Sequence, residues 1–180
     1  AFRSDEEEKI MRNFVRPVVS FFLVLMLLVT IKPVYAATEP PVEDPVLPQP
    51  SSELQPADVV QIVIDALANN DFPYPDAGIE TSFNFTSPAN KVETGPLRRF
   101  TQLLKGPTFS QMINHRDSTL SEVVLDRNKA FRLVQIVGEN NETLYFAFRL
   151  GLQLQGDYVG MWLTEAVWPL QSPGAEVIAL

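Results

Sequence analysis

Residues 143–154 alternate between large apolar side chains and smaller or polar ones, and this pattern constrains the fold more than any other part of the chain. Successive side chains of a β-strand point to opposite faces of a sheet, so one face of this segment must be buried. That face consists of six apolar residues: Leu144, Phe146, Phe148, Leu150, Leu152 and Leu154. Each of them contributes roughly 1.5–3 kcal/mol when fully buried. We therefore expect a central strand here.

Further strands are expected around this one. Residues 129–137 precede it across a polar, glycine-containing loop at 138–142, which is typical of a β-hairpin. Residues 158–168 and 120–125 also have strand composition, and residues 109–116 form a weaker candidate. The sequence therefore predicts an antiparallel meander of four or five strands.

Helices are expected ahead of the strands. From Pro56 onwards, polar residues recur every three to four positions and form one stripe on an otherwise apolar helix. A proline-rich break then separates it from a second short helix with Asp76 as its N-cap. After a turn that begins at Ser87, a third helix starts after 94–96 and ends at 106–107. These elements predict an α+β fold, with three N-terminal helices packed on one face of a curved, cone-like antiparallel sheet.

Residues 11–37 have the organisation of a secretory signal peptide. Arg12 and Arg16 form a basic lead, an almost unbroken apolar run follows at 18–31, and small residues at 34–37 offer a cleavage site. The run is shorter than the roughly 20 residues that span the hydrocarbon core of a membrane. We therefore expect export and cleavage, and an uncleaved membrane anchor is the alternative.

The remaining segments complete the predicted organisation. The acidic residues 1–10 differ from the lead of a signal peptide and are interpreted as an extension ahead of a start at Met11. Residues 38–56 are rich in proline and acidic residues, which favours an extended, disordered linker. Residues 57–170 then form a single α+β domain, and residues 171–180 form a tail.

The composition disfavours several classes of function. The net charge is −8, whereas a nucleic-acid surface needs a basic stripe. The chain has no cysteine and a single histidine, so thiol catalysis, thiolate metal sites and a zinc site are not expected. We expect no cofactor and no metal.

One candidate catalytic set contains the only histidine. His115 and Asp117 would share one strand face and form an acid–base pair, because alternate residues of a strand point the same way. Glu165 is the other candidate acid or base. The alternative is a polar strand end, with Asp117 opening a turn.

A second set suggests a binding surface and consists of Tyr74, Tyr145, Arg149, Gln153 and Trp162. Tyrosine, tryptophan and arginine are enriched in binding hot spots, so this set would face a partner. The alternative is an ordinary solvated sheet face on which Arg149 stacks over Tyr145. Trp162 and Trp168 are an even number of residues apart, which places them on the same face of a regular strand.

Several segments resemble a protein family that occurs in bacteria and photosynthetic organisms and is known only as a domain of unknown function. The segments are Asp58-Val59-Val60, Ala66-Leu67-Ala68-Asn69-Asn70-Asp71, Phe85-Thr86-Ser87-Pro88-Ala89-Asn90-Lys91, Thr94-Gly95-Pro96 and Asn114-His115-Arg116. The resemblance covers most of residues 57–168 and implies a nuclear transport factor 2-like, or cystatin-like cone, fold. It implies a location in the periplasm or thylakoid lumen, with an extracellular or membrane-anchored location as the alternative. It implies no established activity.

Two functions from different classes follow. The first is a non-enzymatic exported module that binds a small apolar ligand or a protein partner through its pocket or its sheet face, alone or as a homodimer. The second is a small isomerase- or hydratase-like enzyme that uses His115 with Asp117 or Glu165. Two ionisable groups that converge in one buried cavity would favour the enzyme.

Overall fold

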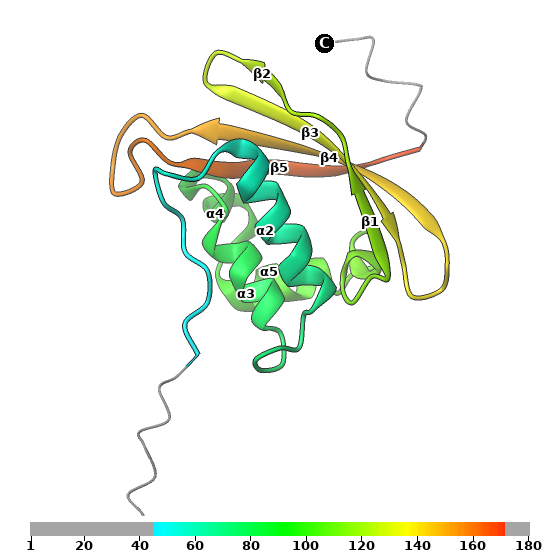
Figure 1. Cartoon of the computed structure of the whole chain (residues 1–180). Helices are drawn as coiled ribbons and strands as arrows, with labels where there is room; N and C mark the ends of the chain where they lie inside the picture. Colours follow the sequence, from blue (N-terminus) through cyan, green and yellow to red (C-terminus); the bar gives the residue numbers. More distant parts are fainter. Residues whose placement is uncertain (1–44, 172–180) are drawn as a thin grey trace, which may run out of the picture. The chain divides into compact units, whose positions relative to one another are not determined.

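The computed structural model describes residues 45–171. The predictions for the signal segment, the acidic extension, most of the linker and the tail fall on residues 1–44 and 172–180, outside the described residues. The described part has α+β structure, which confirms the predicted class: α-helices, one short 3₁₀ helix and a five-stranded antiparallel sheet. The helices lie together on one side of the sheet (Figure 1).

The helices come first along the described chain. They are α2 (Pro56–Ala68), α3 (Ala77–Asn84), α4 (Pro88–Thr94), α5 (Leu97–Leu104) and the 3₁₀ helix η1 (Ser110–Met112). Three α-helices were expected in this region, and the described residues contain four, because the turn predicted at Ser87 continues into α4. Ser87 caps this helix, since its hydroxyl accepts a hydrogen bond of 3.2 Å from the Asn90 backbone N–H.

The strands follow as β1 (Asp117–Leu120), β2 (Val124–Asp126), β3 (Lys129–Val137), β4 (Thr143–Leu152) and β5 (Trp162–Leu170). Their order in the sheet is β1-β3-β4-β5, and β2 also pairs with β3. The hairpin between β3 and β4 is the predicted one. It closes where the Gly138 N–H donates to the Glu142 carbonyl over 3.0 Å.

The apolar face of β4 forms much of the core. Phe146, Phe148 and Leu150 are buried, and Leu144 and Leu152 are half-buried. These five positions agree with the predicted alternation. Leu154 does not, because the strand ends at Leu152 and the Leu154 side chain is 65% exposed.

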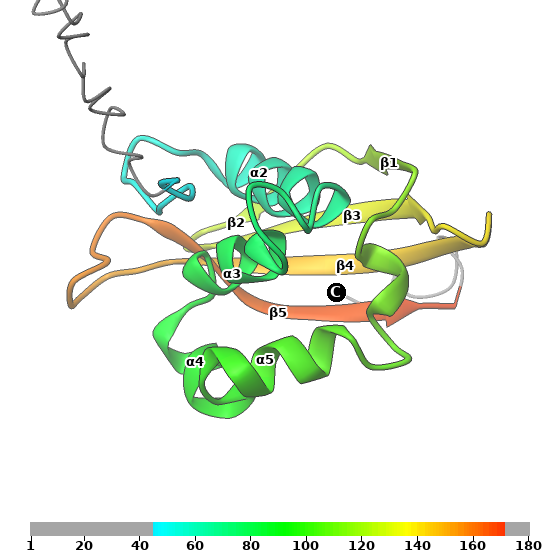
Figure 2. The same ribbon diagram turned by 90° about the horizontal axis from the view of Figure 1, so that it is seen from below.

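Helix α2 covers the core from one side with six buried residues: Pro56, Val59, Val60, Val63, Ile64 and Leu67. The Asp58 carboxylate accepts a hydrogen bond from the Gln55 backbone N–H over 2.9 Å and so stabilises the start of the helix. Helix α3 then packs closely on α2, because Gly78 approaches the Ala66 carbonyl where any Cβ would collide with it. Figure 2 shows α2 on the β3 side of the sheet and α5 beside β5, with α3 between them.

The cap of α3 differs from the prediction. Asp76 precedes the helix, but it has a left-handed backbone with φ of 66° and its side chain makes no capping hydrogen bond. Asn70, at the end of α2, supplies the cap instead. Its side-chain oxygen accepts from the Ile79 N–H over 3.1 Å, and its carbonyl accepts from the Gly78 N–H over 2.9 Å. The cap is therefore tertiary, formed by one helix for the next.

Three strand predictions were wrong in extent or kind. Residues 109–116 contain η1 and a loop instead of a strand, because Asn114 adopts a φ of 52° and its N–H donates to the Leu67 carbonyl at the end of α2. Residues 120–125 are split between β1 and β2, because Ser121 interrupts the strand pairing. The Ser121 N–H donates to the Leu133 carbonyl, and the Ser121 hydroxyl accepts from the Leu133 N–H. The last strand begins at Trp162, four residues later than predicted, because a loop precedes it.

A β-bulge in β5 decides which residues face the helices. Leu150 pairs with Thr164, but Arg149 pairs with Ala166, so Glu165 is an extra residue in the ladder. The bulge reverses the alternation beyond it. Trp162 packs against the core, whereas Trp168 pairs with Ala147 on the opposite face. The prediction that the two tryptophans share a face was therefore wrong.

Residues 45–55 include part of the predicted linker and contain no helix or strand. Leu54 nevertheless packs against the core cluster. The packed part of the chain thus begins a few residues before Ala57.

Candidate ligand-binding site

A cavity of about 230 Å³ lies between the inner face of the sheet and the helices. Most of its wall is apolar, and this part of the wall includes Val63, Leu67, Phe100, Leu104, Phe148 and Val167. These residues come from α2, α5, β4 and β5, so the cavity exists only when the helices and the sheet are assembled. The cavity is partly open to solvent, since Glu93 and Leu103 in its lining are exposed. A concave, mostly apolar space with a few polar groups is the usual form of a small-molecule site.

Thr164 is the polar residue of β5 that faces this cavity. Its cross-strand partner is the inward-facing Leu150, and its own side chain is 5% exposed. Its backbone is held by the segment before α4: the Thr164 N–H donates to the Phe85 carbonyl over 2.8 Å, and its carbonyl accepts from the Ser87 N–H over 2.9 Å. The Thr164 hydroxyl has no hydrogen-bond partner among the described residues. Buried polar side chains are normally paired, so this hydroxyl is an exception.

Three other hydroxyl-bearing residues belong to the lining, and each hydroxyl already donates its proton to a backbone carbonyl four residues earlier. Ser82 donates to Gly78 over 2.9 Å, Thr86 donates to Ser82 over 3.0 Å, and Thr94 donates to Asn90 over 2.9 Å. A hydroxyl has one proton and two acceptor sites. These three hydroxyls can therefore take part in a further hydrogen bond only as acceptors.

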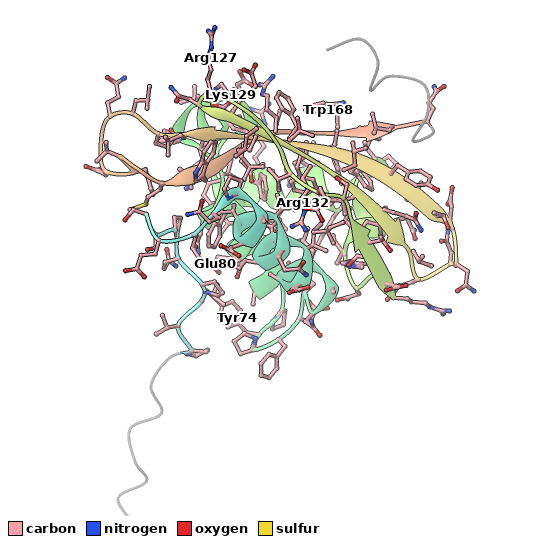
Figure 3. All side chains as sticks on the ribbon, turned by 45° about the horizontal axis from the view of Figure 1, so that its top comes forward. Tyr74, Glu80, Arg127, Lys129, Arg132 and Trp168 are labelled. Carbon is pink, nitrogen blue, oxygen red and sulfur yellow. The ribbon has the colours of Figure 1, made fainter. Side chains whose placement is uncertain are left out.

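The charged residues in the lining are Glu93 and Glu165. The Glu165 carboxylate is occupied on the outer face of the sheet, where it lies 2.5 Å from Lys129 Nζ and 3.4 Å from Arg149 Nε. Gly151 makes this possible, since a side chain there would occupy the position of the carboxylate. Lys129 and Trp168 lie on the far side of the sheet from the helices (Figure 3). Glu93 is the exposed carboxylate of α4 at the cavity.

The structure does not bring the candidate catalytic residues together. His115 is 6% exposed, and its Nδ1 donates to the Met112 carbonyl over 2.8 Å. Asp117 is exposed, and its carboxylate accepts from the Ser118 N–H over 2.9 Å. No hydrogen bond or ion pair within residues 45–171 joins either of them to the other or to Glu165, and the cavity lining includes only Glu165 of the three.

The predicted binding set is dispersed. Tyr74 donates to the Glu80 carboxylate over 3.0 Å, away from the sheet (Figure 3), and burial together with Glu80 raises the pKa of the Tyr74 phenol. Trp162 packs inward against the core, and Gln153 donates to the Gly151 carbonyl over 2.8 Å. Only Tyr145 and Arg149 share the outer face of β4.

The segments that carry the family resemblance meet in space. The Asn70 N–H donates to the Asn114 side-chain oxygen and the Asn114 side-chain amide donates to the Asp71 carboxylate, both over 3.1 Å. The hydrogen bond from Asn114, followed by one from the Asp76 backbone, lowers the pKa of the Asp71 carboxyl. These contacts join the end of α2 to the chain after η1. In addition, the segment 85–94 supplies Thr86, Asn90, Glu93 and Thr94 to the cavity.

The sequence reasoning did not identify Thr164, Thr86 or Glu93 as site residues. The family resemblance included the segment around Ser87, and that was the available signal for Thr86; Glu93 lies between two of the segments that carry the resemblance. Thr164 carried no such signal, because its inward orientation depends on its pairing with Leu150 before the bulge.

Within residues 45–171, no three His, Cys, Asp or Glu side chains are grouped so that they could hold a metal ion. The same residues include no helix with the length and apolar character needed to cross a membrane. No family model, curated protein or solved structure matches the chain.

Proposed function

We propose that this chain is a non-enzymatic binding module that holds a small apolar ligand in the cavity between its sheet and its helices. One observation supports this most strongly: a mostly apolar cavity of about 230 Å³ lies between the helices and the sheet. An engineered protein cavity of about 150 Å³ already binds benzene. The present cavity has room for a larger molecule.

The acid–base alternative has less support. General acid–base catalysis needs ionisable groups within hydrogen-bond reach of one reacting site. Here His115 donates to a backbone carbonyl, Asp117 is exposed and the Glu165 carboxylate is paired with Lys129 on the other face of the sheet. The binding function needs no such convergence.

The cone-like form of the fold, the family resemblance and the export of the chain belong to the same proposal. Helices on one side of an antiparallel sheet, with a cavity between the two layers, agree with a cone architecture. The signal-like segment at 11–37 and the family resemblance support the periplasm or the thylakoid lumen as the location. N-terminal sequencing of the mature protein tests this: a start near residue 38 supports export with cleavage, and recovery of residues 11–37 supports the anchored alternative.

The ligand function is tested with n-butylbenzene, a neutral probe without a head group. Titration into the isotope-labelled full chain should shift the methyl resonances of Val63, Leu67 and Val167, because their side chains line the cavity. Leu103 lines it from α5 and is 44% exposed, so Leu103→Trp can fill the space at little cost to folding. We expect this variant to abolish the shifts.

Gln102→Trp is the matched control, because Gln102 is exposed on the same helix and does not line the cavity. It should bind the probe like the unmodified protein. Shifts that spread over the surface, or binding that survives in Leu103→Trp, would contradict the proposal.

A further inference from the structure

The outer face of the sheet, which points away from the helices, is apolar over most of its length. Successive residues of a strand alternate between the two faces, and Phe148, which packs in the core, marks the inner one. The strand register then identifies the outer residues of β3, β4 and β5, with one step at the bulge. They include seven apolar or aromatic residues: Phe131, Leu133, Val137, Tyr145, Ala147, Trp168 and Leu170.

This composition is unusual for a sheet face in contact with water. An antiparallel sheet that is solvated on one face normally has polar residues on that face. Here the row across its middle consists of Leu133, Ala147 and Trp168, which pair with one another across β3, β4 and β5. The described helices lie on the other side of the sheet (Figures 1 and 2), so no helix within residues 45–171 covers this row. Large exposed apolar patches mark interaction sites.

The charges on the outer face are distributed in a way that suits a second copy of this chain. At one end of β3 and β4, the Glu165 carboxylate lies between two cations, 2.5 Å from Lys129 Nζ and 3.4 Å from Arg149 Nε. This cluster carries one net positive charge, whereas the whole chain carries −8. The outer face therefore lacks the acidic excess that would make two copies repel each other.

The other end of β3 and β4 has the opposite charge. Glu139 and Glu142 are exposed in the hairpin loop there, and the exposed Asp117 of β1 adds a third carboxylate beside Arg116. If two copies face each other with their strands in opposite directions, the cationic end of each lies over the acidic end of the other. Such complementarity fixes the orientation of two partners.

The outer face is also large enough for a specific interface. Strands β3 and β5 have nine residues each, β4 has ten, and β1 and β2 widen the sheet beyond β3. At about 3.3 Å per residue and about 4.8 Å between strands, this surface measures roughly 30 by 19 Å, or about 600 Å². A second copy would remove about 1,200 Å² from water in total, which is the size at which specific protein interfaces begin.

From these observations we infer that the outer face is the contact surface of a homodimer, in which two copies pack sheet against sheet with their strands in opposite directions. The same surface of each copy then meets itself, as in most two-fold dimers. Trp168 and Leu133 lie in the middle row and anchor the contact, because central aromatic and apolar groups are the best shielded from water. The ligand cavity lies on the other side of the sheet, so this inference goes beyond the proposed function and does not depend on it.

The first test is the mass in solution, measured by sedimentation equilibrium on protein purified from cells that express the full chain. The mass should be twice that of one chain, which is 20.2 kDa for all 180 residues. Trp168→Glu and Leu133→Glu each place a carboxylate in the middle row and should weaken dimerisation at least about thirtyfold, since central residues carry most of the affinity of an interface. Urea denaturation checks that each variant folds.

Val92→Glu is the matched control for these variants. Val92 is also apolar and is 84% exposed, but it lies on α4, on the helix side of the sheet. This variant should dimerise like the unmodified protein.

Spin labels test the orientation of the two copies. The chain has no cysteine, so Asn128→Cys and Asn140→Cys each introduce one labelling site, at opposite ends of β3. In dimers labelled at residue 128 of both copies, the two labels should be separated by about 30 Å, the length of β3. Mixed dimers, with one copy labelled at residue 128 and the other at residue 140, should give a clearly shorter distance.

Several outcomes would overturn the inference. One is a monomer at the highest soluble concentration, and another is a dimer whose affinity is the same in Trp168→Glu and Leu133→Glu as in Val92→Glu. A longer distance in the mixed dimers than in the dimers labelled at residue 128 alone would also overturn it. A monomer that binds phosphatidylcholine vesicles, and loses them in Trp168→Glu, would assign the outer face to a membrane instead. None of these results bears on the cavity, which the n-butylbenzene titration tests separately.

Discussion

Helices α2 and α5 cover the same face of the sheet, but they bury it to different extents. Helix α2 has 13 residues, six of them buried, and Val60 and Ile64 pack fully into the core. Helix α5 has eight residues, and only Phe100 and Leu104 are buried. The cavity lies between α5 and the sheet, where Leu104 lines it, and α2 contributes Val63 and Leu67 to its wall. The comparison indicates that α2 contributes more to the packed core, while the looser packing of α5 leaves room for a ligand.

The largest effect is expected for Phe148→Ala. Phe148 is a buried residue of β4 that belongs to the core cluster and also lines the cavity, so it packs in both regions. Its removal should lower the free energy of unfolding by roughly 3–5 kcal/mol, as measured by urea denaturation. A loss below about 1 kcal/mol would show that the neighbouring helices do not depend on this face.

A second pair of substitutions compares the two helices directly. Ile64 is 0% exposed in α2, whereas Leu104 of α5 is 8% exposed beside the cavity. Truncation costs more where the surroundings are already close-packed, so Ile64→Ala should cost about 4 kcal/mol and Leu104→Ala about 2 kcal/mol. The same denaturation measurement checks both, and equal costs would remove the distinction between the two helices.

A smaller effect of the opposite sign is expected at Thr164. Replacing the unpartnered buried hydroxyl by a methyl group of the same shape should raise the free energy of unfolding by about 1 kcal/mol, because an unsatisfied buried polar group is destabilising. Thr119→Val, at an exposed position of β1, should stay within about 0.5 kcal/mol of the unmodified protein. Destabilisation by Thr164→Val would mean that the hydroxyl has a structural role.

The smallest effect concerns pH and the end of α2. Hydrogen bonds from Asn114 and from the Asp76 backbone hold the pKa of Asp71 below its ordinary value of 3.8. A depressed carboxyl pKa stabilises the fold above the ordinary value, and this contribution disappears as the pH falls through the lower, folded value. Thermal unfolding between pH 5 and about pH 2.5 should therefore show a flatter acid limb in Asp71→Asn.

Asp126→Asn, at an exposed position of β2, provides the comparison for this last measurement. Its acid limb should match that of the unmodified protein. If the unfolding temperature falls equally with pH in all three proteins, the contact between Asp71 and Asn114 does not contribute to the stability of the folded state.

Much of the fold was predictable because its signals are local. The alternation in residues 143–152 and the polar loop at 138–142 predicted β4 and its hairpin with β3, since strand faces and tight turns depend on neighbouring residues. The polar stripe that starts after Pro56 predicted α2 for the same reason.

The site was much less predictable. The resemblance pointed to the segments around Asn70, Ser87 and Asn114, but their roles as a helix cap, a cavity wall and a tie to α2 depend on partners far away in the sequence. His115 attracted a catalytic interpretation by its chemistry alone. Its actual partner is the Met112 carbonyl, which a loop and η1 bring close to it in place of the expected strand.

By itself, then, the sequence determined the class of the fold, the buried face of β4 and the course of α2, because side-chain periodicity acts over a few residues. The tertiary structure alone decided that a bulge at Glu165 separates the faces of Trp162 and Trp168, and that Thr164 lies in the lining of a cavity. These features arise from pairing between strands and from the space left between layers. Such quantities depend on residues that meet only when the chain is folded.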